Sequence, residues 1–346
     1  MSDFLSSATW PTLRIRARLL AATRAFFDQR GFTEVDTPLL SADRVIDTHL
    51  SPYAARNADA PRPGEPPLYL QTSPEFAMKR LLASGARDIY QLGKVFRADE
   101  TGRQHNPEFT LLEWYESDAT DADVMETTER LLRHLDAAFR SVEIAGDRQE
   151  CEGDALPARP FRRRTYTELF LDGLGIDPLL ASTEALAELA RRRLGKQVPE
   201  SQSATDRDGW LNLLLATLLE RQLGQDGPEF LTEYPSSQAA LARLRPRSDG
   251  QPVAGRFELY WRGVELCNGY HELTDASELR QRIEAENVRR QTEGLAPLPT
   301  SSRLLDAMDR GLPPCAGNAV GFDRVLMLLL GADRIDAVIP FPTHRA

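Results

Sequence analysis

The sequence has few cysteines and no long apolar segment, and each absence excludes a class of protein. Its three cysteines, Cys151, Cys267 and Cys315, stand far apart. An odd number without metal-ligand spacing predicts a reducing compartment and no structural zinc. No apolar run approaches membrane-spanning length, and the first residues lack a basic region followed by an apolar one. We therefore expect a cytoplasmic protein with neither a membrane anchor nor a signal peptide.

A glycine-rich phosphate loop is also missing, so a nucleotide site would need another architecture. The net charge of −10 argues against broad, sequence-independent binding to nucleic acid. Local basic exceptions are Arg162–Arg164, Arg191–Arg193 and Arg243–Arg247. With 41% hydrophobic and 27% charged residues, the chain has the composition of a globular protein with a large core.

The pattern of apolar residues predicts an α+β fold. Expected helices are Thr12–Arg30, the segment opened by Ser73-Pro74-Glu75, Asp121–Phe139, several within Thr165–Leu223, Asp275–Glu293 and Ser301–Arg310. The segment Ala319–Leu330 is expected to combine a short strand with a helix. Other expected strands are Phe32–Leu40, Leu68–Thr72, Glu229–Tyr234, Arg256–Trp261 and Val264–Leu273, with a loop over Arg44–Pro67 and a polar linker over Cys151–Arg164. Because these strands follow one another as hairpins or meanders, we expect a mostly antiparallel sheet with helices on its faces.

The segment Gly93–Tyr115 carries the densest set of binding groups. It predicts a strand, a polar loop and a strand, with Arg97 ending the first strand and Phe109 starting the second. A guanidinium suits a phosphate and an aromatic ring suits a base. If both face one cleft, strand alternation places Glu113 and Tyr115 deeper in it, where they could hold an ammonium. Taken alone, an ordinary charged surface hairpin explains the segment equally well.

Two carboxylates occur close together in the segment VELCNGYHEL. Glu265 and Glu272 are seven positions apart, so an unbroken strand would turn them to opposite faces. A bulge or kink at Asn268-Gly269 would turn both to one side. Two carboxylates that face a triphosphate suit Mg²⁺. A solvent-facing strand with scattered acids is the simpler explanation of this segment alone.

The segment GNAVGFDRVLMLLL combines small residues with one arginine. Gly317, Ala319 and Gly321 would let a ligand approach the backbone closely. Arg324 follows in the first turn of an apolar helix, where an anion is also favoured. The alternative is a buried strand-to-helix turn whose arginine pairs with a carboxylate.

Three of these segments, in this order, resemble the signature motifs of class II aminoacyl-tRNA synthetases. GFTEVDTP resembles motif 1, FRADE…RQHNPEFTLLEWY motif 2 and GFDRVLMLLLG motif 3. ELCNGYHEL resembles the metal-binding strand of the lysine branch, and TSPEFAMKRLL and HNPEF also resemble that branch. The resemblance spans roughly residues 12–342. It implies the class II catalytic core, an antiparallel sheet of six to seven strands flanked by helices. The chain would be a single domain, 1–346, with a mostly helical insert at about 165–225.

The lysine branch offers more than one acceptor. A lysyl-tRNA synthetase has an N-terminal barrel that binds the anticodon, whereas only some ten residues precede the first expected helix here. The chain is therefore similar to truncated synthetase paralogues that use ATP to activate (R)-β-lysine or lysine and transfer it to a lysine side chain of elongation factor P. Ala319, where the synthetases usually have Gly, also favours this paralogue. It implies a homodimer with Pro38 in its interface and no tRNA partner; a minimal synthetase that charges tRNA and a non-catalytic regulatory paralogue are the alternatives.

The resemblance also implies roles for individual residues. Catalytic roles fall to Arg97 at the α-phosphate, Arg324 at the far phosphates, and Glu265. ATP binding is implied for Arg97, Ala98, Asp99, Glu100, His105, Asn106, Phe109, Glu265, Leu266, Gly321 and Arg324. Amino-acid binding is implied for Ser73, Pro74, Glu75, Glu113, Tyr115, Asn268, Glu272 and Ala319, and Mg²⁺ binding for Glu265 and Glu272. The pair Ala98-Asp99 departs from the usual Asn-Glu, so either Asp99 or Glu100 would supply the carboxylate near adenine.

Overall fold

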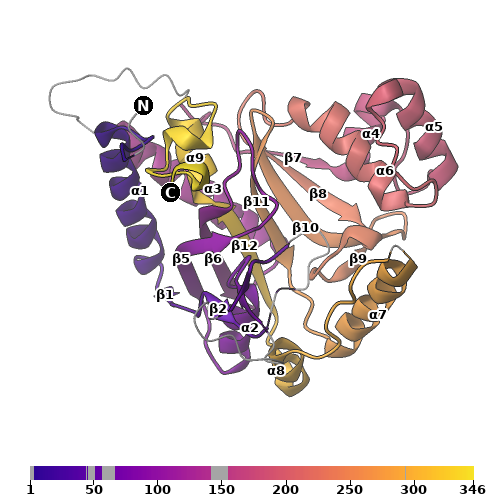
Figure 1. Cartoon of the computed structure of the whole chain (residues 1–346), viewed down its shortest axis with the longest axis horizontal. Coiled ribbons are helices and arrows are strands. Elements are labelled where there is room, and N and C mark those ends of the chain that lie inside the picture. The colour runs from indigo at the N-terminus through magenta and orange to yellow at the C-terminus, as the bar shows by residue number, and fades with distance from the viewer. Residues whose placement is uncertain (1–3, 44, 46–50, 57–66, 142–154, 293) are drawn as a thin grey trace. The chain divides into compact units, whose positions relative to one another are not determined.

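The computed structural model describes residues 4–43, 45, 51–56, 67–141, 155–292 and 294–346 of the chain (Figure 1). The chain divides into two compact units. The first combines the residues up to Ala155 with Leu273–Ala346, and the second is Leu156–Glu272. Cys151 and most of the expected loop over 44–67 lie outside the described residues.

The first unit contains strands of two sheets, with helices packed around them. Its helices are α1 (Trp10–Asp28), α2 (Glu75–Ala83), α3 (Asp121–Arg140), α7 (Ala276–Thr292), α8 (Arg303–Gly311) and α9 (Phe322–Leu329), followed by the 3₁₀ turns η5 (Ile335–Ala337) and η6 (Thr343–Arg345). Its strands are β1 (Thr33–Glu34), β2 (Leu40–Ser41), β3 (Ala54–Ala55), β4 (Leu68–Leu70), β5 (Ile89–Phe96), β6 (Glu108–Ser117) and β12 (Cys315–Gly321).

The expected hairpin is at the centre of this unit. β5 pairs antiparallel with β6, and β6 pairs antiparallel with β12, while the short β1 lies parallel to β5 at the edge. The strands β2, β4 and β3 form a separate small antiparallel sheet. The strand, loop and strand predicted for Gly93–Tyr115 are thereby confirmed.

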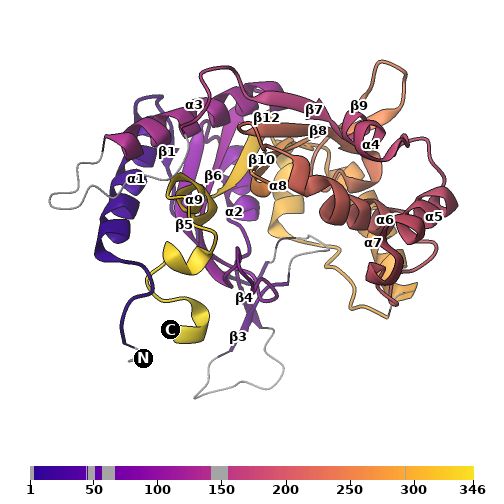
Figure 2. The same ribbon diagram turned by 90° about the horizontal axis from the view of Figure 1, so that it is seen from above.

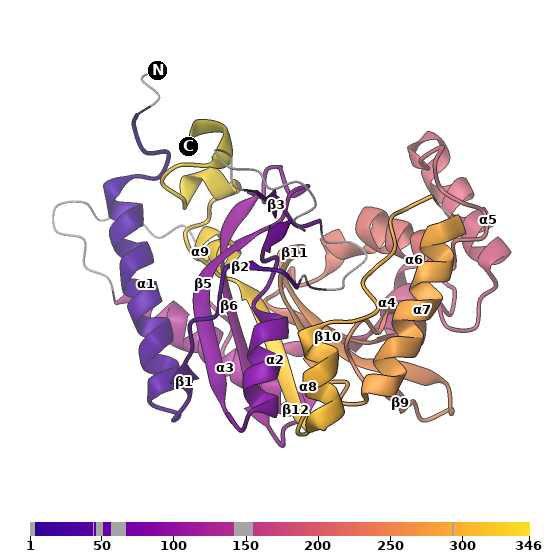
Figure 3. The ribbon, with the colours of Figure 1, turned by 60° about the horizontal axis from the view of Figure 1, so that its bottom comes forward.

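The two faces of the hairpin have different partners. On one face, Phe27 of α1 stacks on Tyr90 with ring centroids 4.6 Å apart and lies 5.4 Å from Trp114. On the other face, Glu113 accepts a hydrogen bond from Ser73, at the entry to α2. Figure 3 shows α2 and α8 side by side, in agreement with their many contacts. One face of the hairpin therefore belongs to the aromatic core, and the other carries the groups that the sequence predicts to bind a ligand.

A buried ion pair joins α1 to the start of α9. Arg16 Nη1 donates to Asp323 Oδ1 at 2.5 Å, and its Nη2 donates to the Thr110 hydroxyl at 2.6 Å. The second carboxylate oxygen of Asp323 accepts the Thr110 backbone N–H at 2.8 Å. The helix α1, the strand β6 and the start of α9 are therefore held together at Asp323, the residue that precedes Arg324. The N-terminal and C-terminal segments also run side by side (Figure 2), where Ser7 N donates to Pro340 O.

The second unit is a sheet with helices on one of its faces. Its strands are β7 (Arg162–Thr165), β8 (Glu229–Pro235), β9 (Leu244–Pro246), β10 (Pro252–Trp261) and β11 (Val264–His271). Its helices are α4 (Tyr166–Leu174), α5 (Thr183–Leu194) and α6 (Arg207–Leu214), with the shorter η1 (Gly195–Gln197), η2 (Leu215–Leu219), η3 (Glu220–Gln222) and η4 (Ser236–Gln238). β10 pairs antiparallel with β8, β9 and β11, and β7 lies parallel to β8.

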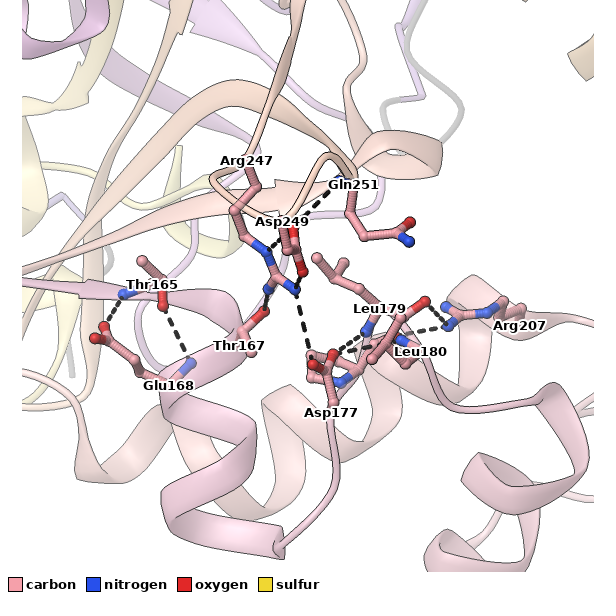
Figure 4. A network of polar contacts seen from close by, with 11 residues as sticks. Thr165, Thr167, Glu168, Asp177, Leu179, Leu180, Arg207, Arg247, Asp249 and Gln251 are labelled. Atoms are coloured by element: carbon pink, nitrogen blue, oxygen red, sulfur yellow. Dashed lines mark hydrogen bonds and ion pairs between the residues drawn. The ribbon is translucent and has the colours of Figure 1, made fainter.

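The helices α4, α5 and α6 share one apolar core with β8 and β10. Leu186, Trp210 and Leu231 are all buried in it. A surface network adds a tie between α4 and the β9–β10 hairpin (Figure 4). Arg247 Nη1 donates to the Thr167 hydroxyl at 2.7 Å, and the guanidinium also pairs with Asp249 and, at 3.9 Å, with Asp177. The helices predicted for Thr165–Leu223 thus pack onto the sheet of their own unit.

Three expected elements differ from the structure. Within the loop expected over 44–67, the described residues Ala54–Ala55 form β3. The single strand expected over Phe32–Leu40 is reduced to β1 and β2, because Pro38 has no N–H and the Thr37 N–H donates to the Gln91 side chain at 2.9 Å. The polar linker expected up to Arg164 ends in β7. Its arginines are tolerated in a strand because Arg164 lies 2.9 Å from the Glu229 carboxylate.

The Arg16–Asp323 pair gives a stability prediction. Arg16→Leu would leave the Asp323 carboxylate buried without its cation, which typically costs about 3–5 kcal/mol. We expect a thermal midpoint several degrees below that of the wild type in differential scanning calorimetry. Arg14→Leu, on the exposed side of the same helix, is the control and should change stability by less than about 0.5 kcal/mol. Equal midpoints for the two variants would contradict the role of the pair.

Candidate active site

Arg97 and Phe109 face each other at the end of the β5–β6 hairpin. The Arg97 guanidinium lies 5.0 Å from the centroid of the Phe109 ring. Its Nε donates to the Thr72 carbonyl at 3.2 Å, and its Nη1 pairs with Glu100 at 2.9 Å. The flat ring and the cation needed for a base and a phosphate are therefore adjacent and held in place.

The structure distinguishes the two acids next to Arg97. Glu100 is half-buried and paired with Arg97, whereas Asp99 is exposed. The backbone N–H of Ala98 donates to the Ser51 carbonyl at 2.8 Å. Of the two acids, Glu100 is therefore the one that contacts Arg97, the residue predicted to bind phosphate, and Asp99 lies on the outside of the turn.

The polar loop of the hairpin contacts α9 and the C-terminal turn. Arg324 Nη2 lies 2.6 Å from Nε2 of His105, which makes Nε2 the acceptor and puts the imidazole proton on Nδ1. Partial burial and then the positive charge of Arg324 lower the pKa of His105. Asn106 donates to the Glu108 carbonyl at 2.6 Å and accepts the Thr343 N–H at 2.9 Å. His105 and Arg324 are thus brought together, while Asn106 fixes the loop.

A buried pocket of acids lies on the same strand face as Phe109. Glu113 accepts hydrogen bonds from the Ser73 hydroxyl at 2.7 Å and from the Tyr115 hydroxyl at 2.8 Å. Glu75, in the first turn of α2 after Pro74, pairs with Lys79 at 2.7 Å. The predicted alternation of Glu113 and Tyr115 with the core residues is confirmed.

Lys79 was missed by the sequence reasoning. Its ammonium is buried, pairs with Glu75 and lies 5.9 Å from the Tyr115 ring centroid. The signal that could have found it is the spacing, because residues four apart on a helix are neighbours. The pocket therefore contains two carboxylates and one internal ammonium.

Burial and, after it, the negative charge of Glu75 together raise the pKa of Glu113 to about 7. The hydrogen bonds from Ser73 and Tyr115 and the charge of Lys79 oppose this rise. A carboxyl with such a pKa is half protonated at neutral pH. A ligand cation beside Glu113 would lower this pKa again, since a nearby positive charge favours the ionised form.

The glycine-rich strand β12 lines this face. Ala319 is the register partner of Glu113, and its methyl group packs against the Val95, Phe109 and Leu111 cluster. A Cβ at Gly317 would lie 2.5 Å from the Tyr115 ring, so only glycine fits there. Gly321, half-exposed, caps the start of α9. The small residue at Gly317 thus leaves room for the aromatic ring of Tyr115.

In the second unit, β11 carries Glu265, one of the two predicted metal ligands, and the other, Glu272, follows directly after its last residue. The register with β10 shifts so that Leu259 pairs with Cys267 and Tyr260 with Glu265, which leaves Leu266 as an extra residue. The predicted parity change therefore occurs, but its position at Asn268-Gly269 is wrong. Phe257 explains Gly269 instead, because a Cβ there would lie 2.2 Å from its ring.

The bulge changes the relation between Glu265 and Glu272. One extra residue between seven-apart positions turns both side chains to the same side of the strand. Glu265 is half-exposed and Glu272 is buried. Among the described residues no group of three or more potential metal ligands gathers. Two carboxylates nevertheless fit Mg²⁺, which keeps water and phosphate oxygens as its other ligands.

Comparison with known proteins adds the family. The model of the class II tRNA synthetases for Asp, Lys and Asn (D, K and N) matches residues 2–345. The chain belongs to this family. As a class II synthetase domain it is an adenylate-forming enzyme that uses ATP, and the expected class II fold is confirmed.

Individual relatives of this synthetase domain are similar over almost their whole length. A protein of Yersinia enterocolitica named elongation factor P–(R)-β-lysine ligase is 40% identical, with 98% of this chain and 97% of the relative covered. Proteins of the same name from Vibrio parahaemolyticus and Proteus mirabilis are also 40% identical, over 99% and 100% of this chain and 98% and 99% of theirs. In the described part of the synthetase chain, no helix is both long and apolar enough to cross a membrane.

The coupled acids of the pocket give a titration prediction. Glu75→Gln removes the neighbouring negative charge, so we expect the pKa of Glu113 to fall below its wild-type value of about 7. Carboxyl ¹³C NMR across pH 4–9 measures it. Glu108→Gln, at the exposed start of β6, is the matched control and should leave the titration unchanged. In the wild type, affinity for an ammonium ligand should fall as the pH drops below about 7, because protonation removes the charge of Glu113.

Proposed function

We propose that this protein activates (R)-β-lysine with ATP as an acyl-adenylate and transfers it to a lysine side chain of elongation factor P. The observation that carries the proposal is the 40% identity to ligases of that name across 98% of this chain. The pocket fits the substrate class, because an amino acid with two amines needs a buried carboxylate such as Glu113.

The first step needs positioning and charge rather than an enzyme nucleophile. A carboxylate oxygen of the amino acid attacks the α-phosphorus of ATP, and the bond to pyrophosphate breaks. Arg97 neutralises the charge that develops on the α-phosphate while Phe109 stacks on adenine. Glu100 keeps the Arg97 fork in place, and Arg324 with His105 lies against the far phosphates.

Magnesium would join this step through the second unit. Glu265 and Glu272 would hold Mg²⁺, which neutralises phosphate charge when bound. Leu266 at the bulge turns the two carboxylates the same way, and its backbone borders ATP. Asn268 and Glu272 contribute to amino-acid binding.

In the second step, the amine of the acceptor lysine attacks the carbonyl carbon of the acyl-adenylate. An amide forms, the bond to AMP breaks, and the proton of the amine passes to a phosphate of the substrate or to a carboxylate of the pocket. A free lysine is mostly protonated at neutral pH. The acceptor lysine therefore has to lose its extra proton before its nitrogen can attack.

Three further properties belong to the proposal. Both units form one catalytic domain, since the family match runs through both, with 165–225 as a helical insert. No tRNA is charged. The protein acts in the cytoplasm, a compartment that suits the cysteine thiols, because Cys267 and Cys315 are buried and form no disulfide among the described residues.

The test measures ATP–pyrophosphate exchange first and transfer of the amino acid second. We expect the purified protein to catalyse ATP–pyrophosphate exchange with (R)-β-lysine in the presence of Mg²⁺, and to transfer the radiolabelled amino acid to purified elongation factor P. Total tRNA should stay unlabelled. Efficient labelling of tRNA would favour the minimal synthetase. No exchange with any lysine isomer would leave the non-catalytic paralogue and overturn the proposal.

A matched pair of variants controls this experiment. Arg97→Ala should abolish exchange while the protein stays folded, because removing a charge-assisted donor at such a centre typically costs about 10²–10³ in rate. Arg103→Ala removes the same charge from the same loop, where Arg103 pairs with Asp333 at the surface, and should retain exchange. Equal activity of the two variants would contradict the role of Arg97.

We also propose a homodimer through the segment around Pro38. Pro38, Leu39 and Leu40 are exposed, and Leu68 on the neighbouring β4 is exposed as well. We expect sedimentation at the mass of two chains. Leu40→Asp should shift it to one chain, because a charge in an apolar interface is costly, whereas Leu171→Asp on the exposed side of α4 should not. A wild type that sediments as one chain would rule the dimer out.

A further inference from the structure

A chain of buried and half-buried polar side chains runs from strand to strand over one face of the sheet of the second unit. It begins in the apolar core beneath α4, α5 and α6 and ends on β11. We name it the Arg256 chain, and it consists of Tyr234, Tyr260, Glu258, Arg256, Asn268 and Tyr270. None of the first four was singled out from the sequence, and catalysis as described above does not use them.

Glu258 is the acceptor at the centre of the Arg256 chain. Its Oε2 accepts hydrogen bonds from the hydroxyls of Tyr234 and, at 2.6 Å, of Tyr260. Its Oε1 accepts from Arg256 Nη2 at 2.6 Å. Positions 256, 258 and 260 alternate along β10, so all three side chains leave the same face of the strand. Both oxygens of the carboxylate thus accept hydrogen bonds, from three donors in all.

Arg256 connects Glu258 to Asn268 on β11. Its Nη1 donates to the Gln238 carbonyl at 2.8 Å, and its Nε donates to Oδ1 of Asn268 at 3.2 Å. Nδ2 of Asn268 donates to the Tyr270 hydroxyl at 3.1 Å. Because a guanidinium can only donate, the carboxamide oxygen must face Arg256. The N–H₂ group of Asn268 therefore points the other way, with one N–H used by Tyr270 and the second left for a ligand oxygen.

The helices of the second unit keep water away from the start of the chain. Tyr234 and Tyr260 belong to the apolar core that α4, α5 and α6 form. The ring of Tyr166 on α4 lies 5.1 Å from that of Tyr234. Burial and the charge of Glu258 raise the pKa of both Tyr234 and Tyr260 well above the usual range. Both hydroxyls therefore stay protonated donors, and the hydrogen bonds gain strength in the dry core.

We propose that Arg256 and Glu258 are positioning residues that fix the Asn268 carboxamide with its N–H toward the carboxylate of the amino-acid substrate. The helices of 165–225 serve this arrangement by burying the tyrosine end of the chain. An unfixed carboxamide could rotate and present its oxygen to the substrate carboxylate, which would repel it. The inference rests on the proposed function and gives the helical insert a role in it.

The test is a double-mutant cycle between Arg256 and Asn268. In Arg256→Lys the charge beside Glu258 is kept, but a lysine cannot reproduce the planar fork. We expect the KM for (R)-β-lysine in ATP–pyrophosphate exchange to rise about 10- to 100-fold, the typical cost of a hydrogen bond to a charged group, with the KM for ATP within about twofold. Asn268→Ala should raise the same KM, and the double variant should show no further rise.

Two other variants separate positioning from folding. Arg247→Met breaks the surface network of Figure 4 between the β9–β10 hairpin and α4, so it should lower the thermal midpoint and leave both KM values unchanged. Tyr260→Phe removes one hydroxyl from Glu258 with little change of volume. It should raise the amino-acid KM in the same sense as Arg256→Lys, and it is used if Arg256→Lys does not fold.

The outcomes are distinct. If the wild type exchanges and the Arg256 and Asn268 effects multiply instead of coinciding, or the KM for ATP rises equally, the positioning role is overturned and the proposed function stands. If the wild type does not exchange with any lysine isomer, the proposed function fails and this inference fails with it.

Discussion

The alternation of side chains along β6 is the constraint on which the first unit depends. Because successive residues point to opposite faces, Trp114 faces the aromatic core of α1 while Phe109 and Glu113 face the pocket. A shift of the register by one residue would exchange the two sets and bury Glu113 against Phe27. The tight packing of the core face therefore also fixes the side-chain positions on the opposite face. The hydrogen bond from the Thr110 N–H to Asp323 fixes the start of α9 against the same strand.

The charge balance of the pocket follows from burial. Glu75 and Glu113 share it with one internal ammonium, that of Lys79. When both acids are ionised, one negative charge has no partner within this buried group. Desolvation of the Glu113 carboxylate and repulsion by Glu75 therefore raise the pKa of Glu113. A lysine-like amino acid has two ammonium groups and one carboxylate, so it carries one net positive charge. Such a ligand would neutralise the remaining negative charge of the pocket, whereas an amino acid without net charge would not.

The sequence predicts what depends on local periodicity and fails where a distant partner decides. The faces of the hairpin follow from a period of two, and they are as expected. The bulge at Leu266 depends on how β11 pairs with β10, which the sequence of β11 alone does not contain. Likewise β7 looks like a polar linker until Glu229, far along the chain, pairs with its arginines. Arg256 and Glu258 resemble the charges of an exposed strand, and only the folded sheet shows that they face a core.

The family membership explains activation but leaves the choice of amino acid to small features of the pocket. Ala319 pairs with Glu113 across the strands, and directly paired residues point to the same side. In the proposed function, the methyl group that stands in place of the usual glycine's hydrogen therefore narrows the space beside Glu113, the carboxylate proposed to bind the amine. One methyl group in a closed pocket is worth about 1–3 kcal/mol of discrimination. That is enough to favour one of two lysine isomers, which differ only in where an amine is attached. On this argument the preference for an isomer arises at β12, while the nucleotide clamp at Arg97 and Phe109 is the same for either.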